Sequence, residues 1–108
     1  MLRSIEELHG YTIHATDGDI GTVHAFFFDD KTWAIRYIAV DTVNWWPGKK
    51  VLVAVTWIEY VDWAESRVHV DLSRDQVKGS PEFDATAPVN RDYESRLYDY
   101  YGRPAYWP

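Results

Sequence analysis

The residue types that could carry chemistry are few in this chain, and the histidines come first: His9, His14, His24 and His69. Imidazole nitrogens bind zinc and move protons, but a zinc site needs several ligands at suitable spacings. Neither H-E-x-x-H nor H-x-H occurs in the sequence. In the hairpin predicted below, His14 and His24 project to opposite faces, so without a bulge they cannot share a metal ion. We therefore interpret the four histidines as surface residues and predict no metal site.

Two acidic turns, Asp17-Gly18-Asp19 and Asp29-Asp30, could in principle bind a hard cation. An EF-hand loop beginning at Asp17 would need an acid at its fifth position, glycine at its sixth and glutamate at its twelfth. The sequence places Gly21, Thr22 and Phe28 there. Asp and Gly are typical of tight turns, so we interpret both segments as ordinary hairpin turns.

Nucleophilic and phosphate-binding motifs are missing from the sequence. The absence of cysteine excludes thiol nucleophiles, disulfide frameworks and Cys-ligated metal clusters. No G-x-S-x-G nucleophile motif, G-x-G-x-x-G loop or P-loop occurs. The sequence therefore predicts a protein that is not an enzyme and that needs no cofactor.

The aromatic residues are more informative, because six Trp and eight Tyr are many for a core of this size. Trp33, Tyr37 and Trp57 lie in strand-like segments and are expected in the core. Trp45 and Trp46 instead precede a loop sequence, Pro-Gly-Lys-Lys, that ends at residue 50. Aromatic residues are preferred anchors of protein interfaces. Either this pair binds a partner protein, or one or both side chains fold back and close an end of the domain.

Length and composition set the class of protein. The chain has 108 residues, of which 46% are hydrophobic, and this corresponds to one domain with a core. Eleven basic residues against seventeen acidic ones give a net charge of −6, which argues against nucleic-acid binding. The longest apolar stretch, residues 51–58, is too short to span a membrane, and residues 1–10 lack an apolar signal core. We therefore expect a cytoplasmic protein without membrane insertion.

The strands that must position these residues are short. Asp17-Gly18 between two β-prone segments predicts a hairpin with Ala15 opposite Ile20. This register places large apolar residues on both faces, so either the second strand is buried on both sides or Gly21 forms a bulge. The expected strands are 11–16, 19–28, 33–42, 51–57 and 66–71.

Two helices are predicted after the strands. Ser73 followed three residues later by Gln76 is a capping box and begins a short helix that ends near Gly79. Residues 80–89 contain two prolines and are expected to be an extended connector. Asn90 is a good N-cap for a helix over 91–101, which Gly102 ends. One stripe of this helix is apolar and packs either on its own domain or on a second subunit; it consists of Tyr93, Leu97, Tyr100 and Tyr101.

Several segments, in this order, carry a family resemblance: Leu2-Arg3-Ser4 with Gly10-Tyr11, the DG-x-IG-x-V stretch over 17–23, Phe28-Asp29-Asp30, 33–41, 51–53, 68–73 and the tail 80–107. Together they resemble the PRC-barrel family. The family includes the barrel of the photosynthetic reaction-centre H subunit, a ribosome-maturation factor and stand-alone bacterial proteins, and the tail resembles a subgroup of the latter. The resemblance implies a small barrel that binds or positions other proteins, with no catalytic residues to carry over.

We accordingly predict a mainly β fold, a PRC-barrel-like barrel of about five or six strands with a short helix and a C-terminal helix. Residues 1–79 form the barrel, and 80–108 form the connector and helix of the same single domain.

The predicted function is a non-enzymatic adaptor or scaffold that forms a homodimer or a larger homo-oligomer. The expected partner-binding residues are Trp45, Trp46, Lys49 and Lys50, and the expected oligomer contacts are Tyr93, Leu97, Tyr100 and Tyr101. Two alternatives stay open: a sensor that binds a small molecule or a metal, and an assembly factor associated with the ribosome or RNA. The negative net charge weighs against direct RNA contact.

Overall fold

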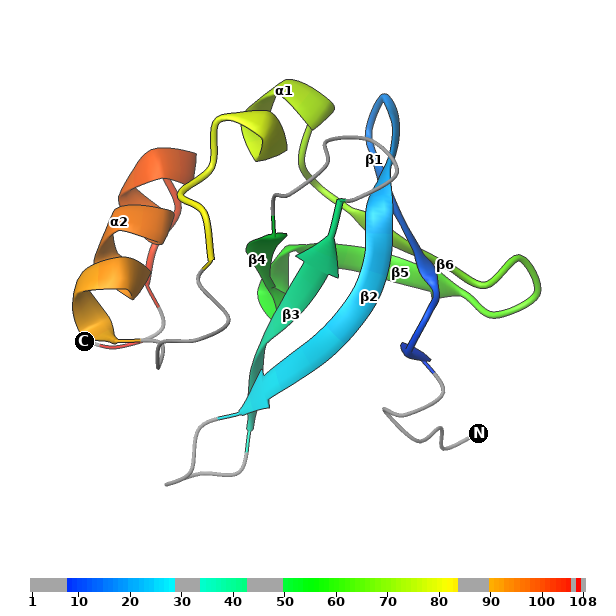
Figure 1. The fold of residues 1–108 in the computed structure, drawn as a ribbon, viewed down its shortest axis with the longest axis horizontal. Coiled ribbons are helices and arrows are strands. Elements are labelled where there is room, and N and C mark those ends of the chain that lie inside the picture. Colours follow the sequence, from blue (N-terminus) through cyan, green and yellow to red (C-terminus); the bar gives the residue numbers. More distant parts are fainter. Residues whose placement is uncertain (1–7, 29–33, 43–49, 84–89, 106, 108) are drawn as a thin grey trace.

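The computed structural model describes residues 8–28, 34–42, 50–83, 90–105 and 107 (Figure 1). Six strands come first along the chain: β1 (Thr12–Ala15), β2 (Gly18–Phe28), β3 (Ile35–Asp41), β4 (Lys50–Ala54), β5 (Ile58–Asp62) and β6 (Arg67–Val70). A one-turn 3-10 helix, η2 (Val55–Trp57), separates β4 from β5, and two α-helices follow the strands: α1 (Arg74–Lys78) and α2 (Arg91–Tyr101). The prediction of a mainly β fold with a short helix and a C-terminal helix is confirmed.

The six strands form one sheet in the order β4-β3-β2-β1-β6-β5. Neighbouring strands are antiparallel except β1 and β6, which are parallel. Figure 1 shows β5 and β6 crossing behind β2 at a steep angle, as expected of a strongly curved sheet. Within the described residues no ladder joins β4 to β5, so the sheet stays open where a closed barrel was predicted. The two edge strands are instead connected through the turn of η2.

The β1–β2 hairpin differs from the predicted register. Ala15 pairs with Gly18 rather than with Ile20, because the two residues between the strands are Thr16 and Asp17. His14 then pairs with Asp19. The register shifts between His14 and Ile13, so that Ile13 pairs with Gly21 and not with Ile20. The alternative of a bulge near Gly21 is therefore confirmed. A bulge increases the local bend and twist of a strand.

The strand predicted over 51–57 ends earlier in the structure. β4 ends at Ala54, and the next three residues form η2. Trp57 at the end of η2 is buried, as is Tyr37 on β3, so both predictions of core residues are confirmed. The third expected core residue, Trp33, lies outside the described residues.

The core lies between the curved sheet and α2, which stands beside β3 and β4 in Figure 1. Trp57 contacts two tyrosines of α2, with ring centroids 5.5 Å from Tyr98 and 4.8 Å from Tyr101. The largest fully buried aliphatic side chains are Ile13, Ile20, Ile38, Leu52, Leu72 and Leu97. Leu97 is on α2 and Leu72 follows β6, so the helix and the sheet share one core.

Both predicted helices have the expected caps. Ser73 forms a complete capping box with Gln76 at the start of α1. The side chain of Asn90 accepts a hydrogen bond from the backbone N–H of Tyr93 at 2.8 Å, and Gly102 ends α2 in the left-handed conformation. These local contacts fix the helix bounds that the sequence indicates.

We predict that Gly21→Ala destabilises the protein by about 3 kcal/mol or more, measured as a lower midpoint of urea unfolding. Gly21 has φ +149°, and a Cβ there would overlap the carbonyl oxygen of Asp41. Gly102→Ala is the matched control, because Gly102 has φ +65° with nothing near its missing Cβ. The control should cost about 1 kcal/mol through backbone conformation alone. Equal losses in the two variants would contradict the steric explanation.

Candidate functional site

The predicted partner surface lies mostly outside the described residues, which include neither Trp45, Trp46 nor Lys49. Lys50 is described, is partly buried and is the first residue of β4. It pairs with Asp41, the last residue of β3, and its carbonyl oxygen accepts a hydrogen bond from the backbone N–H of Phe83 at 2.8 Å. The connection that contains both tryptophans therefore begins and ends on hydrogen-bonded backbone.

The predicted oligomer stripe divides into two parts. Tyr93, Leu97 and Tyr101 are buried in the core of their own chain. Tyr100 is 42% exposed. The sequence left open whether this stripe packs on its own domain or on a second subunit. In the single chain, three of its four side chains pack on their own domain.

Hydrogen bonds from two tyrosine hydroxyls connect α2 to the segments that precede it in the chain. Tyr93 donates a hydrogen bond to the carbonyl oxygen of Pro81 at 2.8 Å, and Tyr100 donates one to that of Gln76 at 2.6 Å. After the helix, the Arg103 guanidinium donates to the carbonyl oxygen of Asp71 at 2.6 Å. These bonds satisfy carbonyl groups of the connecting segments and fix the position of the helix.

A buried polar contact joins α2 to the sheet. The Tyr37 hydroxyl donates to Oε2 of Glu94 at 2.5 Å, and both residues are buried. Arg91 lies one turn before Glu94, with 3.6 Å between its Nε and the carboxylate Oε1. Burial, and then the hydrogen bond to Glu94, raise the pKa of Tyr37 above its ordinary value. This contact positions the helix and exposes no reacting group.

Neighbouring tyrosines share this environment. Burial raises the pKa of Tyr101 to about 12, and it also raises the pKa values of Tyr93 and Tyr98. All of them are neutral hydroxyl groups at physiological pH. They act as core residues and not as acids or bases. The Tyr93 hydroxyl donates to Pro81, whereas the buried Tyr101 hydroxyl has no hydrogen-bond partner among the described residues.

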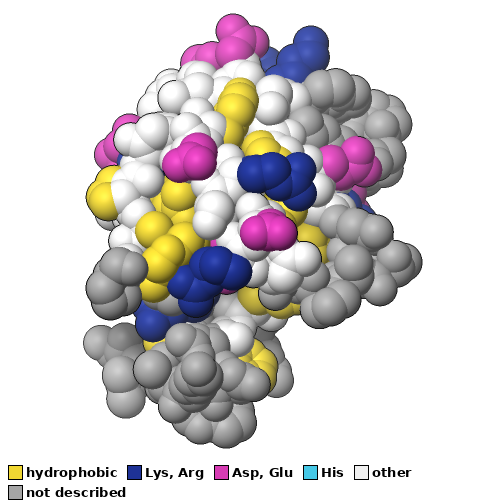
Figure 2. All heavy atoms as spheres, turned by 90° about the vertical axis from the view of Figure 1, so that its left-hand side faces the viewer, with side chains coloured by type: hydrophobic (Ala, Val, Ile, Leu, Met, Phe, Trp, Pro, Cys, Tyr) yellow, Lys and Arg dark blue, Asp and Glu magenta, His cyan; other side chains and the backbone are white. Residues whose placement is uncertain are grey.

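Figure 2 shows the side of the molecule that carries α2. Apolar side chains alternate there with charges of both signs, and no described histidine is visible on it. Two arginines of this region are engaged within the chain: Arg91 lies 3.9 Å from the ring centroid of Trp107, and Arg103 contacts Asp71. The described residues on this side form no large field of one sign.

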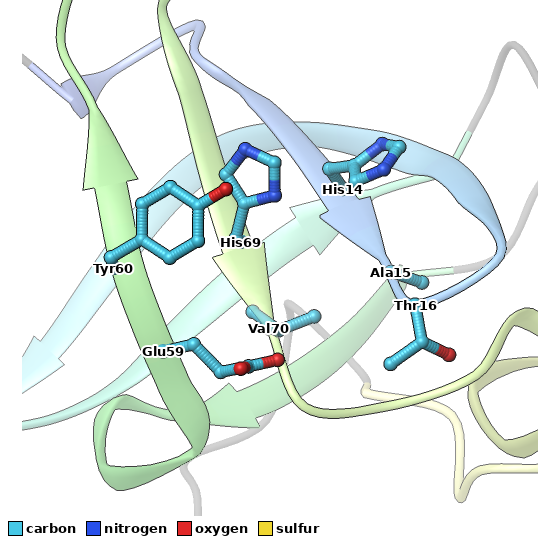
Figure 3. Close-up of a pocket in the computed structure, with 7 residues that line it drawn as sticks. All are labelled: His14, Ala15, Thr16, Glu59, Tyr60, His69 and Val70. Carbon is cyan, nitrogen blue, oxygen red and sulfur yellow. The ribbon is translucent and has the colours of Figure 1, made fainter.

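A second candidate site lies on the outer face of the sheet and was missed by the sequence analysis (Figure 3). His14 on β1 and His69 on β6 are register partners, so both side chains project to the same face. Their ring centroids are 4.9 Å apart with an interplanar angle of 65°. Tyr60 on β5 is 56% exposed and stacks on His69 at 4.2 Å and 10°.

These three rings border a shallow hollow of about 390 Å³, whose other lining residues are Ala15, Thr16, Glu59 and Val70. On the far side of His14, its Nδ1 lies 2.7 Å from Oδ1 of Asp19 on β2. The hollow thus combines imidazole, phenol, hydroxyl and carboxylate groups at the surface. Such a set can bind a ligand but contains no activated nucleophile.

Two absences apply to the described part of the chain. None of its helices is both long and apolar enough to cross a membrane. It also contains no cluster of three or more His, Cys, Asp or Glu residues that could hold a metal ion.

Comparison with known proteins gives two results. The model of the PRC-barrel domain matches residues 2–77. An uncharacterized protein of Deinococcus radiodurans is 36% identical over 92 residues, which make up 83% of this chain and 31% of that protein. The chain thus spans about a third of the length of this relative.

We predict that Tyr37→Phe lowers the free energy of unfolding by about 1–3 kcal/mol, because it leaves the buried Glu94 carboxylate without this donor. Tyr100→Phe is the control; it loses a hydrogen bond at an exposed position and should cost about 0.5–1 kcal/mol. Adding Glu94→Met to Tyr37→Phe should recover part of the loss. Chemical denaturation of the four proteins measures these differences. If Tyr37→Phe cost no more than Tyr100→Phe, the contact would not be the one that holds α2.

Proposed function

The chain belongs to the PRC-barrel domain family, and from this premise we propose that it is a non-enzymatic adaptor that binds another protein through an aromatic surface. The family is generally non-catalytic. No nucleophile or phosphate-binding motif occurs in the sequence. The groups gathered at the described surface are suited to binding and not to bond cleavage.

The observation that carries the proposal is the position of the sequence Trp-Trp-Pro-Gly-Lys-Lys, which ends at Lys50. It lies in the connection between β3 and β4, next to the last pair of that ladder, Asp41 and Lys50. β4 is also an edge strand of the sheet. Binding residues are often carried on loops that a rigid scaffold positions, and tryptophan is a preferred interface anchor. We assign partner binding to Trp45 and Trp46, with Lys49 and Lys50 at the rim.

Protein is a better partner class than nucleic acid. The net charge of −6 opposes association with phosphate backbones. Arg91 and Arg103 are both engaged within the chain. A protein surface that accepts tryptophan side chains and offers acidic groups to the two lysines fits this chemistry.

Self-association through α2 is the second part of the proposal. Three residues of its stripe, Tyr93, Leu97 and Tyr101, are buried in the core, and the connector 80–89 joins the helix to the preceding part of the domain. Exchange of α2 between two copies would preserve each contact between the helix and the core, including the hydrogen bond between Tyr37 and Glu94. Exposed Tyr100 would then lie beside the second copy. We propose a cytoplasmic homodimer or larger homo-oligomer of this kind.

The partner surface can be tested with Trp45→Ala and Trp46→Ala. Each substitution should weaken the complex with a protein partner by about 2 kcal/mol, roughly a thirtyfold loss of affinity, and should leave the melting temperature nearly unchanged. The partner would be identified by crosslinking and mass spectrometry, and its affinity would then be measured with purified protein. Phe28→Ala removes another exposed aromatic residue at the end of β2 and is the control.

A fall of many degrees in the melting temperature of either tryptophan variant would contradict this assignment. It would show that the side chains close the domain internally, which is the alternative interpretation of the pair. Unchanged affinity with unchanged stability would remove both roles.

Self-association predicts a particle mass of at least twice the 12.7 kDa of one chain across a range of concentrations. Size exclusion with light scattering measures this mass directly. Shortening the connector by deleting residues 85–88 should favour exchange of α2 and keep the dimer, because a short connection cannot return the helix to its own sheet. A constant monomer mass for both proteins would contradict the oligomer.

A further inference from the structure

The parallel pairing of β1 and β6 creates a histidine pair that is independent of the adaptor surface. The residues, 55 positions apart in the sequence, are opposite each other in the ladder as His14 and His69. Within the described part of the chain, neither ring nitrogen of His69 has a hydrogen-bond partner. Two imidazoles in van der Waals contact at a surface hollow are an arrangement that a shared ion would stabilise.

We propose that His14 and His69 together bind one divalent transition-metal ion, with Cu²⁺ preferred, at the outer face of the sheet. The ring separation fits this role. Two imidazoles that share an ion have centroids roughly 4.5–5.5 Å apart, because each metal–nitrogen bond is about 2.0–2.1 Å. The observed centroid separation is 4.9 Å, and the planes are inclined by 65°, so the rings are not stacked on each other.

Asp19 prepares His14 for such a role. A carboxylate can only accept a hydrogen bond, so Nδ1 of His14 carries the proton and donates to Oδ1 of Asp19 at 2.7 Å. In the neutral form of the ring the lone pair is then on Nε2. Asp19 comes from β2 and His69 from β6, so the two partners of His14 belong to strands on opposite sides of β1. Metal-binding histidines usually have a carboxylate or carbonyl partner of this kind.

The surroundings define the type of site. Tyr60 stacks on His69 and restricts the orientation of its ring, as the labelled side chains in Figure 3 show. Thr16 and Glu59 line the rest of the hollow, which has room for water. Since no third His, Cys, Asp or Glu among the described residues completes a cluster with the pair, water would fill the remaining coordination positions. An open site with two imidazoles follows the general order of affinity, with Cu²⁺ above Ni²⁺ and Zn²⁺.

The test uses the full chain without a histidine tag and isothermal titration with CuCl₂, NiCl₂ and ZnCl₂ at neutral pH. We expect one Cu²⁺ per chain and weaker binding of Ni²⁺ and Zn²⁺. His14→Ala and His69→Ala should each lower the affinity for Cu²⁺ by at least about a hundredfold, since each removes one of two ligands. His24→Ala is the matched control, because His24 is exposed on β2 and away from the pair; it should bind as the unmodified chain does.

Asp19→Asn tests the positioning role of Asp19 separately. It should weaken Cu²⁺ binding by about tenfold to a hundredfold while the stoichiometry stays at one ion, because it acts through His14. Shifts of the His14 and His69 ring resonances on titration with diamagnetic Zn²⁺, without a shift of His24, would place the ion.

The proposal fails if His69→Ala binds Cu²⁺ as tightly as the unmodified chain, since the ion would then need at most one of the two rings. Equal loss in His24→Ala, or the absence of any stoichiometric binding, would also overturn it. These outcomes leave the adaptor proposal untouched, because capture of a partner through Trp45 and Trp46 is measured without metal.

Discussion

The close approach of β2 to the end of β3 at Gly21 is the constraint on which the rest of the structure depends. The position holds a residue without a Cβ, at φ +149°, against the backbone carbonyl of Asp41. The bulge beside it lets both Ile20 and Val23 face the core although they are three residues apart on one strand. A straight strand could bury only every second residue. The bend therefore converts an otherwise flat meander into a curved sheet with an enclosed core.

The curved sheet stays open, so one side of its core needs a cover, and α2 supplies it. Helices of eleven residues are marginal in isolation, and their stability comes from packing of an apolar face. Here Leu97 and the tyrosines of α2 supply that face, and Trp57 in η2 meets them from the sheet. A purely apolar contact is not directional and would allow the helix to shift along its axis. The hydrogen bond from Tyr37 to Glu94 is directional and selects one position of the helix on the sheet.

Local signals in the sequence predict most of the elements, whereas contacts between distant segments could not be predicted. The capping box at Ser73, the N-cap at Asn90 and the left-handed Gly102 act within a few residues, so the bounds of α1 and α2 follow from the sequence alone. The predicted register of the first hairpin is wrong because the turn residues are Thr16-Asp17 and not Asp17-Gly18. Both pairs satisfy turn preferences, so the sequence does not distinguish them. Within the described residues β4 and β5 do not pair with each other, and no sequence pattern distinguishes two such edge strands from neighbouring strands of a closed barrel.

The same limit explains why the histidine pair was missed. His14 was compared with His24, on the other strand of the same hairpin, because hairpin pairing can be inferred from sequence. Its true neighbour is His69, which a parallel ladder between β1 and β6 brings alongside after 55 residues. No turn signals a parallel pair, because the intervening chain must cross the fold to return in the same direction. The parallel ladder also places the pair on the outer face of the sheet, whereas Trp45 and Trp46 belong to the connection at its β4 edge. The two surfaces share no residue, so the fold allows an ion and a protein partner to bind without competing for the same side chains.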